Sequence, residues 1–139
     1  MDYTIIEGPW SVSQANHDGK PVFLRLNTGV EPMIGDKVYS FRIGIAVPLQ
    51  RPREDGLPSE EENIYFNQIE DEIFTFFDKE LRGFVCVIIA TGGMKEFMTY
   101  SKIENIDELI GGLKLKFPEY DFQSYVVKDE NWDGYKEFM

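Results

Sequence analysis

The sequence predicts a single α+β domain, built on an antiparallel sheet with two helices on one of its faces. Three observations predict it. Patterns typical of strands and helices follow one another between residues 38 and 128 in the order strand, helix, strand, strand, helix, strand. A β-hairpin pattern precedes them in residues 1–30, and an aromatic tail follows in residues 129–139. A length of 139 residues with 42% hydrophobic side chains fits one domain with one core.

The first two predicted strands form a hairpin over Gly8 to Asn27. The Asp18-Gly19 pair separates two β-rich runs, and glycine accepts the positive φ that a tight turn requires. A third strand is expected over residues 39–47, where large apolar residues alternate with small or polar ones.

A loop with three prolines, residues 48–58, then leads into the first predicted helix. Ser59 followed by Glu62 fits a capping box, in which the glutamate reaches back to the cap. We expect the helix to end at Gly83 as a C-terminal cap. Its apolar stripe consists of Phe66, Ile69, Ile73, Phe76 and Phe77.

The continuous apolar run of residues 84–91 predicts a strand buried on both faces, and Gly92-Gly93 predicts a turn into a partner strand over residues 95–101. We expect Asn105 to cap a second helix, with Glu108 three residues on, and Pro118 to end it. The last strand is expected over residues 121–127, and one helical turn in the tail.

This order of elements predicts a ferredoxin-like βαββαβ core over residues 38–128. Both helices then cover one face of the sheet, and something else must cover the other face. The hairpin is expected either to extend the sheet at an edge or to fold over the open face.

The net charge of −11 comes from 25 acidic and 14 basic side chains. It disfavours direct binding to nucleic acid or to an anionic membrane and favours a basic protein partner, although acidity also serves solubility. The single cysteine, Cys86, lies in an apolar run and cannot form an internal disulfide. With no apolar segment long enough to cross a bilayer, we expect a cytoplasmic protein.

Catalytic residues are not recognisable. His17 beside Asp18 lies in a predicted turn without a nucleophile, and the thiol of Cys86 in an apolar strand lacks the positive setting that stabilises a thiolate. We therefore predict no catalytic residue and regard an enzyme as the weaker interpretation.

Metal and cofactor sites are not predicted either. Neither Glu60-Glu61-Glu62 with Asp55, nor Asp129-Glu130 with Asp133, has the spacing of a calcium loop, and no Cys/His set fits zinc. The Gly92-Gly93 pair lacks the lysine and helix of a phosphate-binding loop.

Large amphipathic aromatic residues are the remaining candidates, because they anchor protein interfaces as readily as they fill cores. From the sequence they can be either. The candidate partner-binding residues are Trp10, Asp55, Tyr100, Trp132 and Tyr135.

A set of short motifs distributed along the chain resembles a bacterial family of domains of unknown function, which occur alone or beside domains similar to the regulator of ribonuclease E activity B. The resemblance implies no catalytic residues. It rests on Trp10, residues 39–47, Asp55-Gly56-Leu57-Pro58, the hairpin ending near Tyr100, Phe117-Pro118-x-Tyr120 and Asp129-x-x-Trp132-x-x-Tyr135.

Three functions stay open. The first is a non-catalytic acidic module that regulates or inhibits a basic protein, for example an immunity protein. The second is a carboxylate- or metal-dependent enzyme, which requires a cleft with converging acids. The third is a small-ligand-binding domain, as a monomer or as a homodimer that pairs sheet faces, which requires an enclosed apolar pocket.

Overall fold

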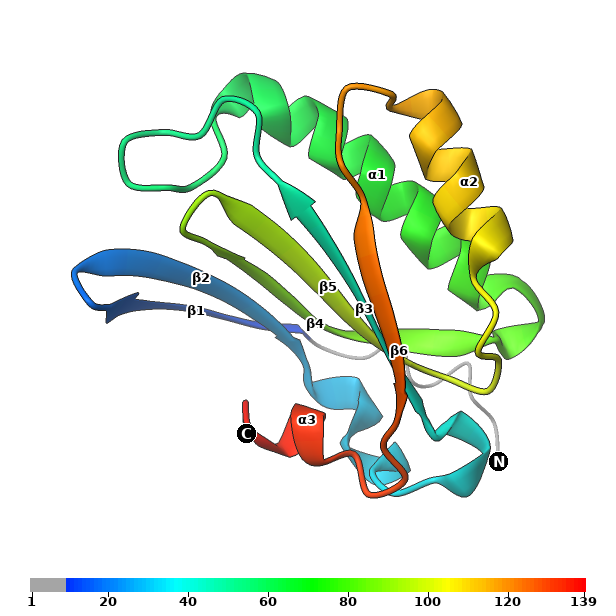
Figure 1. Ribbon diagram of the computed structural model, residues 1–139. Coiled ribbons are helices and arrows are strands. Elements are labelled where there is room, and N and C mark those ends of the chain that lie inside the picture. Colours follow the sequence, from blue (N-terminus) through cyan, green and yellow to red (C-terminus); the bar gives the residue numbers. More distant parts are fainter. Residues whose placement is uncertain (1–9) are drawn as a thin grey trace.

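The computed structural model describes residues 10–139, so the first nine residues of the predicted hairpin extension lie outside the described part. Figure 1 shows one open sheet between two layers of helices. The strands are β1 (Trp10–His17), β2 (Lys20–Asn27), β3 (Phe41–Pro48), β4 (Gly83–Thr91), β5 (Met94–Ser101) and β6 (Gln123–Lys128). The helices are η2 (Thr28–Met33), η3 (Lys37–Tyr39), α1 (Glu60–Asp78), η4 (Lys79–Leu81), α2 (Asp107–Lys116) and α3 (Asp133–Lys136), where η marks a 3-10 helix.

The six strands form a single antiparallel sheet in the order β1-β2-β4-β5-β3-β6. The hairpin β1–β2 turns at Asp18-Gly19, and β2 pairs with β4, so the hairpin extends the sheet at its edge. The predicted α+β class is therefore confirmed, and of the two placements expected for the hairpin the edge is the one found.

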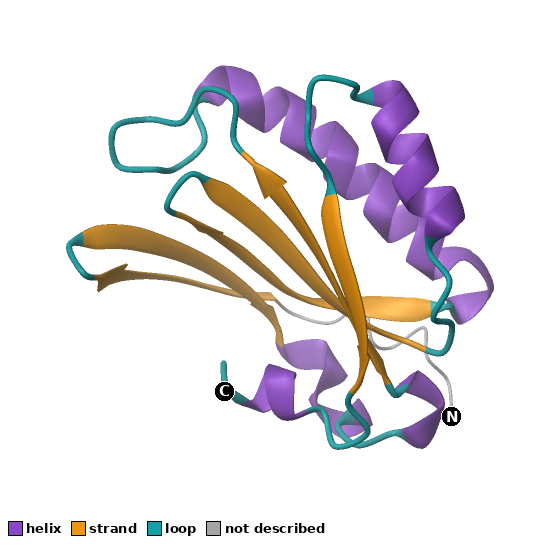
Figure 2. Cartoon of the chain, viewed as in Figure 1, coloured by secondary structure: helices purple, strands orange, loops and turns teal. Residues whose placement is uncertain are grey.

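The first face of the sheet is covered by α1 and α2 (Figure 2), and α1 packs against β4, the strand next to the hairpin. The predicted stripe of α1 is buried through Phe66, Ile69, Ile73 and Phe77, with Phe76 half-buried at the margin. Towards its turn, the β1–β2 hairpin extends beyond the helices (Figure 1), which positions the site described below. In the described chain, no helix combines the length and the apolarity that crossing a membrane requires.

The second face is covered by η2, η3 and α3, and the C-terminal tail supplies its largest side chains. Trp132 is fully buried and stacks on Tyr100 with 4.1 Å between ring centroids and 8° between planes. Its indole Nε1 donates to the Tyr39 carbonyl oxygen at 2.9 Å. Tyr135 is also fully buried, and its hydroxyl donates to the Asn27 carbonyl oxygen at 2.7 Å.

The tail is held to the sheet by the carboxylate of Asp129. This carboxylate accepts hydrogen bonds from the Tyr100 hydroxyl at 2.7 Å, the Gly134 N–H at 3.0 Å and the Asp133 N–H at 2.9 Å, and it pairs with Arg42 at 3.1 Å. Trp132 lies between Asp129 and Asp133 in the sequence. It adopts a φ of 60°, which a non-glycine residue holds only when its surroundings impose it.

A β-bulge interrupts β4, because the pairing with β5 shifts between Val85 and Val87. Cys86 is the extra residue, so Cys86 and Val87 both face the second core while Val85 and Ile88 face the first. Burial raises the pKa of the Cys86 thiol, as expected for a structural cysteine.

Some predicted element ends are wrong by a few residues. Helix α1 ends at Asp78 and not at Gly83, which begins β4 and packs on the Tyr100 carbonyl, where no Cβ fits. Asn105 accepts from the Asp107 N–H at 2.9 Å, but α2 starts at Asp107 with no side-chain cap, because the asparagine closes a turn before the helix.

Only half of the predicted capping box at α1 is present. Ser59 Oγ accepts from the Glu62 N–H at 3.3 Å, as predicted. The Glu62 side chain, which is 2% exposed, turns away from the cap. It accepts instead from the backbone N–H groups of Gln50 at 2.9 Å and Arg51 at 2.5 Å, and from the Tyr120 hydroxyl at 2.8 Å. Glu62 therefore anchors the proline-rich loop rather than its own helix.

Candidate functional site

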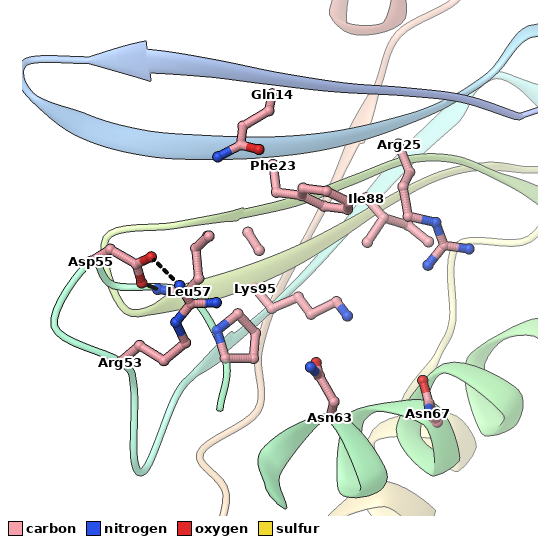
Figure 3. Close-up of a pocket in the computed structure, with 12 residues that line it drawn as sticks. Gln14, Phe23, Arg25, Arg53, Asp55, Leu57, Asn63, Asn67, Ile88 and Lys95 are labelled. Atoms are coloured by element: carbon pink, nitrogen blue, oxygen red, sulfur yellow. Dashed lines mark hydrogen bonds and ion pairs between the residues drawn. The ribbon is translucent and has the colours of Figure 1, made fainter. Parts of the chain in front are cut away.

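A cleft of about 500 Å³ opens where the sheet extends beyond α1 (Figure 3). It lies between strands β2, β4 and β5, the outer side of α1 and the proline-rich loop of residues 48–58. Alternation along the strands brings Phe23, Ile88 and Ala90 to the floor. The whole lining consists of Gln14, Phe23, Arg25, Arg53, Asp55, Leu57, Pro58, Asn63, Asn67, Ile88, Ala90 and Lys95.

An ion pair lies at each end of the cleft. Arg25 on β2 pairs with Glu70 on α1, with 2.6 Å between Nη1 and Oε1, and the Glu70 side chain is 15% exposed. Arg53 and Asp55 in the loop pair at 2.8 Å. The first pair connects the sheet to α1 across the cleft, and the second lies within the loop.

Lys95 lies between the two ion pairs and extends across the cleft in Figure 3. Its ammonium nitrogen lies 5.3 Å from the Phe66 ring centroid and 5.9 Å from that of Phe97. Among the described residues, no carboxylate comes within ion-pair distance of it. Burial lowers its pKa, and the attraction of Glu70 is opposed by the repulsion of Arg25.

The loop that forms one wall is fixed to the body of the domain. The Leu49 N–H donates to the Gly93 carbonyl oxygen at 2.8 Å, and the Gly93 N–H donates to the Gly56 carbonyl oxygen at 2.9 Å. Gly56 has a φ of 84°, and its ideal Cβ position lies 3.1 Å from the Gly92 nitrogen. Together with Glu62, these contacts give the cleft a preformed wall.

Of the residues predicted from the sequence as partner-binding, only Asp55 lines the cleft. Trp10 lies at the start of β1, where its ring packs edge-on to Phe74 at 6.0 Å and beneath the Arg25 guanidinium at 5.3 Å. It therefore supports the Arg25 end of the cleft from outside.

The prediction for the other three residues is corrected, because the structure buries them. Tyr100, Trp132 and Tyr135 are each 0% exposed, so in this structure they are core residues and present no surface to a partner. Of the two roles left open by the sequence, core or interface, these three residues therefore have the core role. The physical reason is that the second face needs aromatic cover and the tail supplies it.

His17 and Asp18 lie 3.5 Å apart with side chains 82% and 91% exposed, as for solvated turn residues. Within residues 10–139, no group of three or more His, Cys, Asp or Glu side chains is placed to hold a metal ion. Three further residues that line the cleft, Lys95, Asn63 and Asn67, were not among those predicted from the sequence.

Comparison with protein families gives a match over residues 9–139 to a family described as "Family of unknown function (DUF695)". The chain belongs to this family. The match includes every element described above, from β1 to α3. No curated protein matches the chain, and no solved structure does.

Proposed function

We propose that this domain binds a small ligand in the cleft between β2, β4, β5 and α1. One observation carries the proposal, which is the cleft itself. Its volume of about 500 Å³ lies within the range typical of ligand sites, and it combines an apolar floor with a few converging polar groups. The cleft is only partly enclosed, and it is this partly enclosed site that supports the proposal.

The arrangement of the walls supports binding with little rearrangement. The Arg25–Glu70 ion pair holds β2 to α1, and the Glu62 contacts hold the loop to α1. A preformed site avoids the ordering cost that a flexible one incurs on binding. Binding is favoured over catalysis because the titratable lining groups are two paired arginines, one paired aspartate and one lysine.

The test is a nuclear magnetic resonance titration with three matched pairs of compounds. They are octanoate and octanamide, 4-phenylbutyrate and its amide, and N-acetyl-Phe-Leu with a free or an amidated C-terminus. We expect at least one compound to shift the backbone amide signals of Phe23, Ile88 and Ala90.

A pair of substitutions on α1 provides the control. Asn67 and Gln68 are neighbours and both exposed, but only Asn67 faces the cleft. Asn67→Trp should fill the opening and weaken binding at least tenfold, whereas Gln68→Trp should leave binding unchanged. If none of the six compounds shifts these signals, or if both variants bind as the wild type does, the proposed function is wrong.

A second candidate function, binding of a basic protein partner, is favoured by the outer edge of β6, which pairs with no further strand among residues 10–139. Tyr125, Val126 and Val127 on this strand are 44%, 36% and 38% exposed, and an unpaired strand edge accepts a further strand. The net charge of −11 would speed the encounter with a basic chain.

This second function is tested by measuring how strongly the domain associates with a given basic partner. Val127→Lys places a like charge on the edge and should weaken association several-fold, as should rising ionic strength. Val12→Lys on β1, at the opposite edge of the sheet, is the matched control. Association that resists both Val127→Lys and salt would remove this candidate.

The proposal includes a ferredoxin-like arrangement for residues 38–128. The element order β3-α1-β4-β5-α2-β6, with β5 between β3 and β4 in the sheet, supports it. It also includes a cytoplasmic location, supported by the single, buried Cys86 thiol.

A further inference from the structure

We infer that the ligand of the cleft is a monoanion with an apolar body, and that its carboxylate is bound by Lys95. This inference rests on the proposed function and specifies its ligand class. It is carried by the placement of one lysine, the charges around it and the surface beneath it.

The backbone directs Lys95 into the cleft. It follows the Gly92-Gly93 turn on β5, opposite Ala90 on β4 and Val47 on β3, so it lies in the middle of the sheet and on the helix side. Its alkyl stem covers the edge of the first core beside Phe66, and its ammonium remains in the cleft.

The acids near Lys95 are already engaged. Glu70 is paired with Arg25 and Asp55 with Arg53. In a chain with 25 acidic residues, none of the described ones pairs with the half-buried Lys95. Burying a charge without a partner is unfavourable, and the lowered pKa of Lys95 has this cause. A ligand carboxylate would provide the missing partner.

The charge of the site fits one negative group. Arg25, Arg53 and Lys95 are three cations, and Asp55 and Glu70 are two carboxylates, so one positive charge remains uncompensated. A dianion such as phosphate would meet repulsion from both carboxylates without a second free cation.

Polar and apolar groups are arranged on either side of Lys95. Asn63 and Asn67 lie one turn apart on α1, where their amide groups can donate to the second carboxylate oxygen. On the other side, Phe23 and Ile88 offer an apolar floor for the body of the ligand. The site therefore recognises an apolar carboxylic acid, either free or as the C-terminus of a peptide.

The acid and amide pairs named above test this directly. We expect each acid that binds to do so at least tenfold more tightly than its amide. Lys95→Met should reduce the preference to about one, because the substitution keeps the stem and removes the charge. Lys95→Arg should keep much of it. Lys114→Met, at an exposed position on α2 away from the cleft, should change nothing.

The pH dependence provides an independent readout. Affinity for the acids should fall as pH rises through the pKa of Lys95, whereas affinity for the amides should stay constant. The other charged groups facing the cleft are Arg25, Arg53, Asp55 and Glu70. Lys95→Met should also melt at a higher temperature than the wild type at neutral pH, since a half-buried charge without a carboxylate partner is removed.

The outcomes separate the two levels of the proposal. Equal affinity for acids and amides, with signals shifting in the cleft, would overturn the monoanion inference and leave the cleft as a ligand site. A preference for acids that survives Lys95→Met would overturn the role of Lys95. Binding of octanoate or 4-phenylbutyrate without the free peptide identifies a small organic acid as the ligand, and binding of the free peptide alone identifies a C-terminus; either supports the inference. The failure of all six compounds to bind would overturn the cleft and the inference together.

Discussion

Replacing Asp129 by asparagine should weaken the attachment of the C-terminal tail to the sheet. The carboxylate accepts from three donors and pairs with Arg42, and the residue is 8% exposed. The Asp129→Asn side chain keeps one acceptor oxygen and places an NH₂ group where the other was. At least one donor then loses its acceptor. It is either the Asp133 N–H, which bonds to one carboxylate oxygen, or the Tyr100 hydroxyl and the Gly134 N–H, which bond to the other.

The magnitude follows from the bonds lost. Each hydrogen bond to a charged group contributes about 1.5–3 kcal/mol. One lost bond, with the weakened attraction to Arg42, predicts that Asp129→Asn lowers the free energy of unfolding by about 3 kcal/mol. This is a large part of the roughly 5–15 kcal/mol typical of a domain. Urea denaturation followed by circular dichroism measures the difference at neutral pH, and Glu130→Gln, which neutralises the exposed neighbour, is the control.

The difference should depend on pH. Burial opposes ionisation of Asp129, but the hydrogen bonds from Gly134, Tyr100 and Asp133 and the charge of Arg42 outweigh it, so its pKa lies below the ordinary value of 3.8. The carboxylate thus stabilises the fold above that ordinary value, and this contribution is lost as pH falls through the lowered pKa. A loss below about 1 kcal/mol at neutral pH, or a loss that does not shrink in acid, would refute the reasoning.

The remaining predictions concern the loop anchor, two glycines and the thiol. Glu62→Gln should lower the free energy of unfolding by about 2 kcal/mol in urea denaturation, because the backbone N–H groups of Gln50 and Arg51 lose a charged acceptor, while the exposed Glu61→Gln should change it little. Gly44→Ala should destabilise by about 1–3 kcal/mol, since its Cβ position lies 2.0 Å from an aromatic ring, whereas Gly111→Ala, in open space on α2, should stabilise by about 1 kcal/mol. Cys86 should react with a thiol reagent only in denaturant, and rapid labelling of the native protein would contradict its burial.

Features of the fold that depend on neighbouring residues could be predicted from the sequence. The turn at Asp18-Gly19 and the Ser59 cap are fixed by the backbone preferences of a few residues, and both are found where the sequence places them. Glu62 is different. Its spacing from Ser59 fits a capping box, but its side chain does not reach back to the cap. Its actual partners on the loop and at Tyr120 depend on how distant segments meet.

The role of the tail could not be predicted for the same reason. Tyr135 bonds to Asn27 across 108 residues of chain, and no local pattern specifies that contact. Aromatic residues in a short polar segment fit an interface as well as a core, and only the return of the tail beneath the second face decides between them. The three named residues of the motif Asp129-x-x-Trp132-x-x-Tyr135 are all buried, so the motif is structural.

The candidate site was the least predictable part, although one signal for it exists. In a strand, residues two apart share a face, so Lys95 shares the face of Phe97, which is part of the first core. A lysine on the core side of a central strand indicates a charge that needs a partner. The cleft itself could not be inferred, because it depends on the sheet being wider than the helices that cover it.

The bulge in β4 also bears on how the length of this strand can change. Deleting Cys86 would leave Val85 and Val87 adjacent and on opposite faces, so every later side chain would keep its side. Deleting Ile88 instead would invert all the residues that follow it. Cys86 is thus a position where a one-residue deletion preserves the pattern of the sheet, and we expect homologous chains that lack it to show an unbroken alternation there.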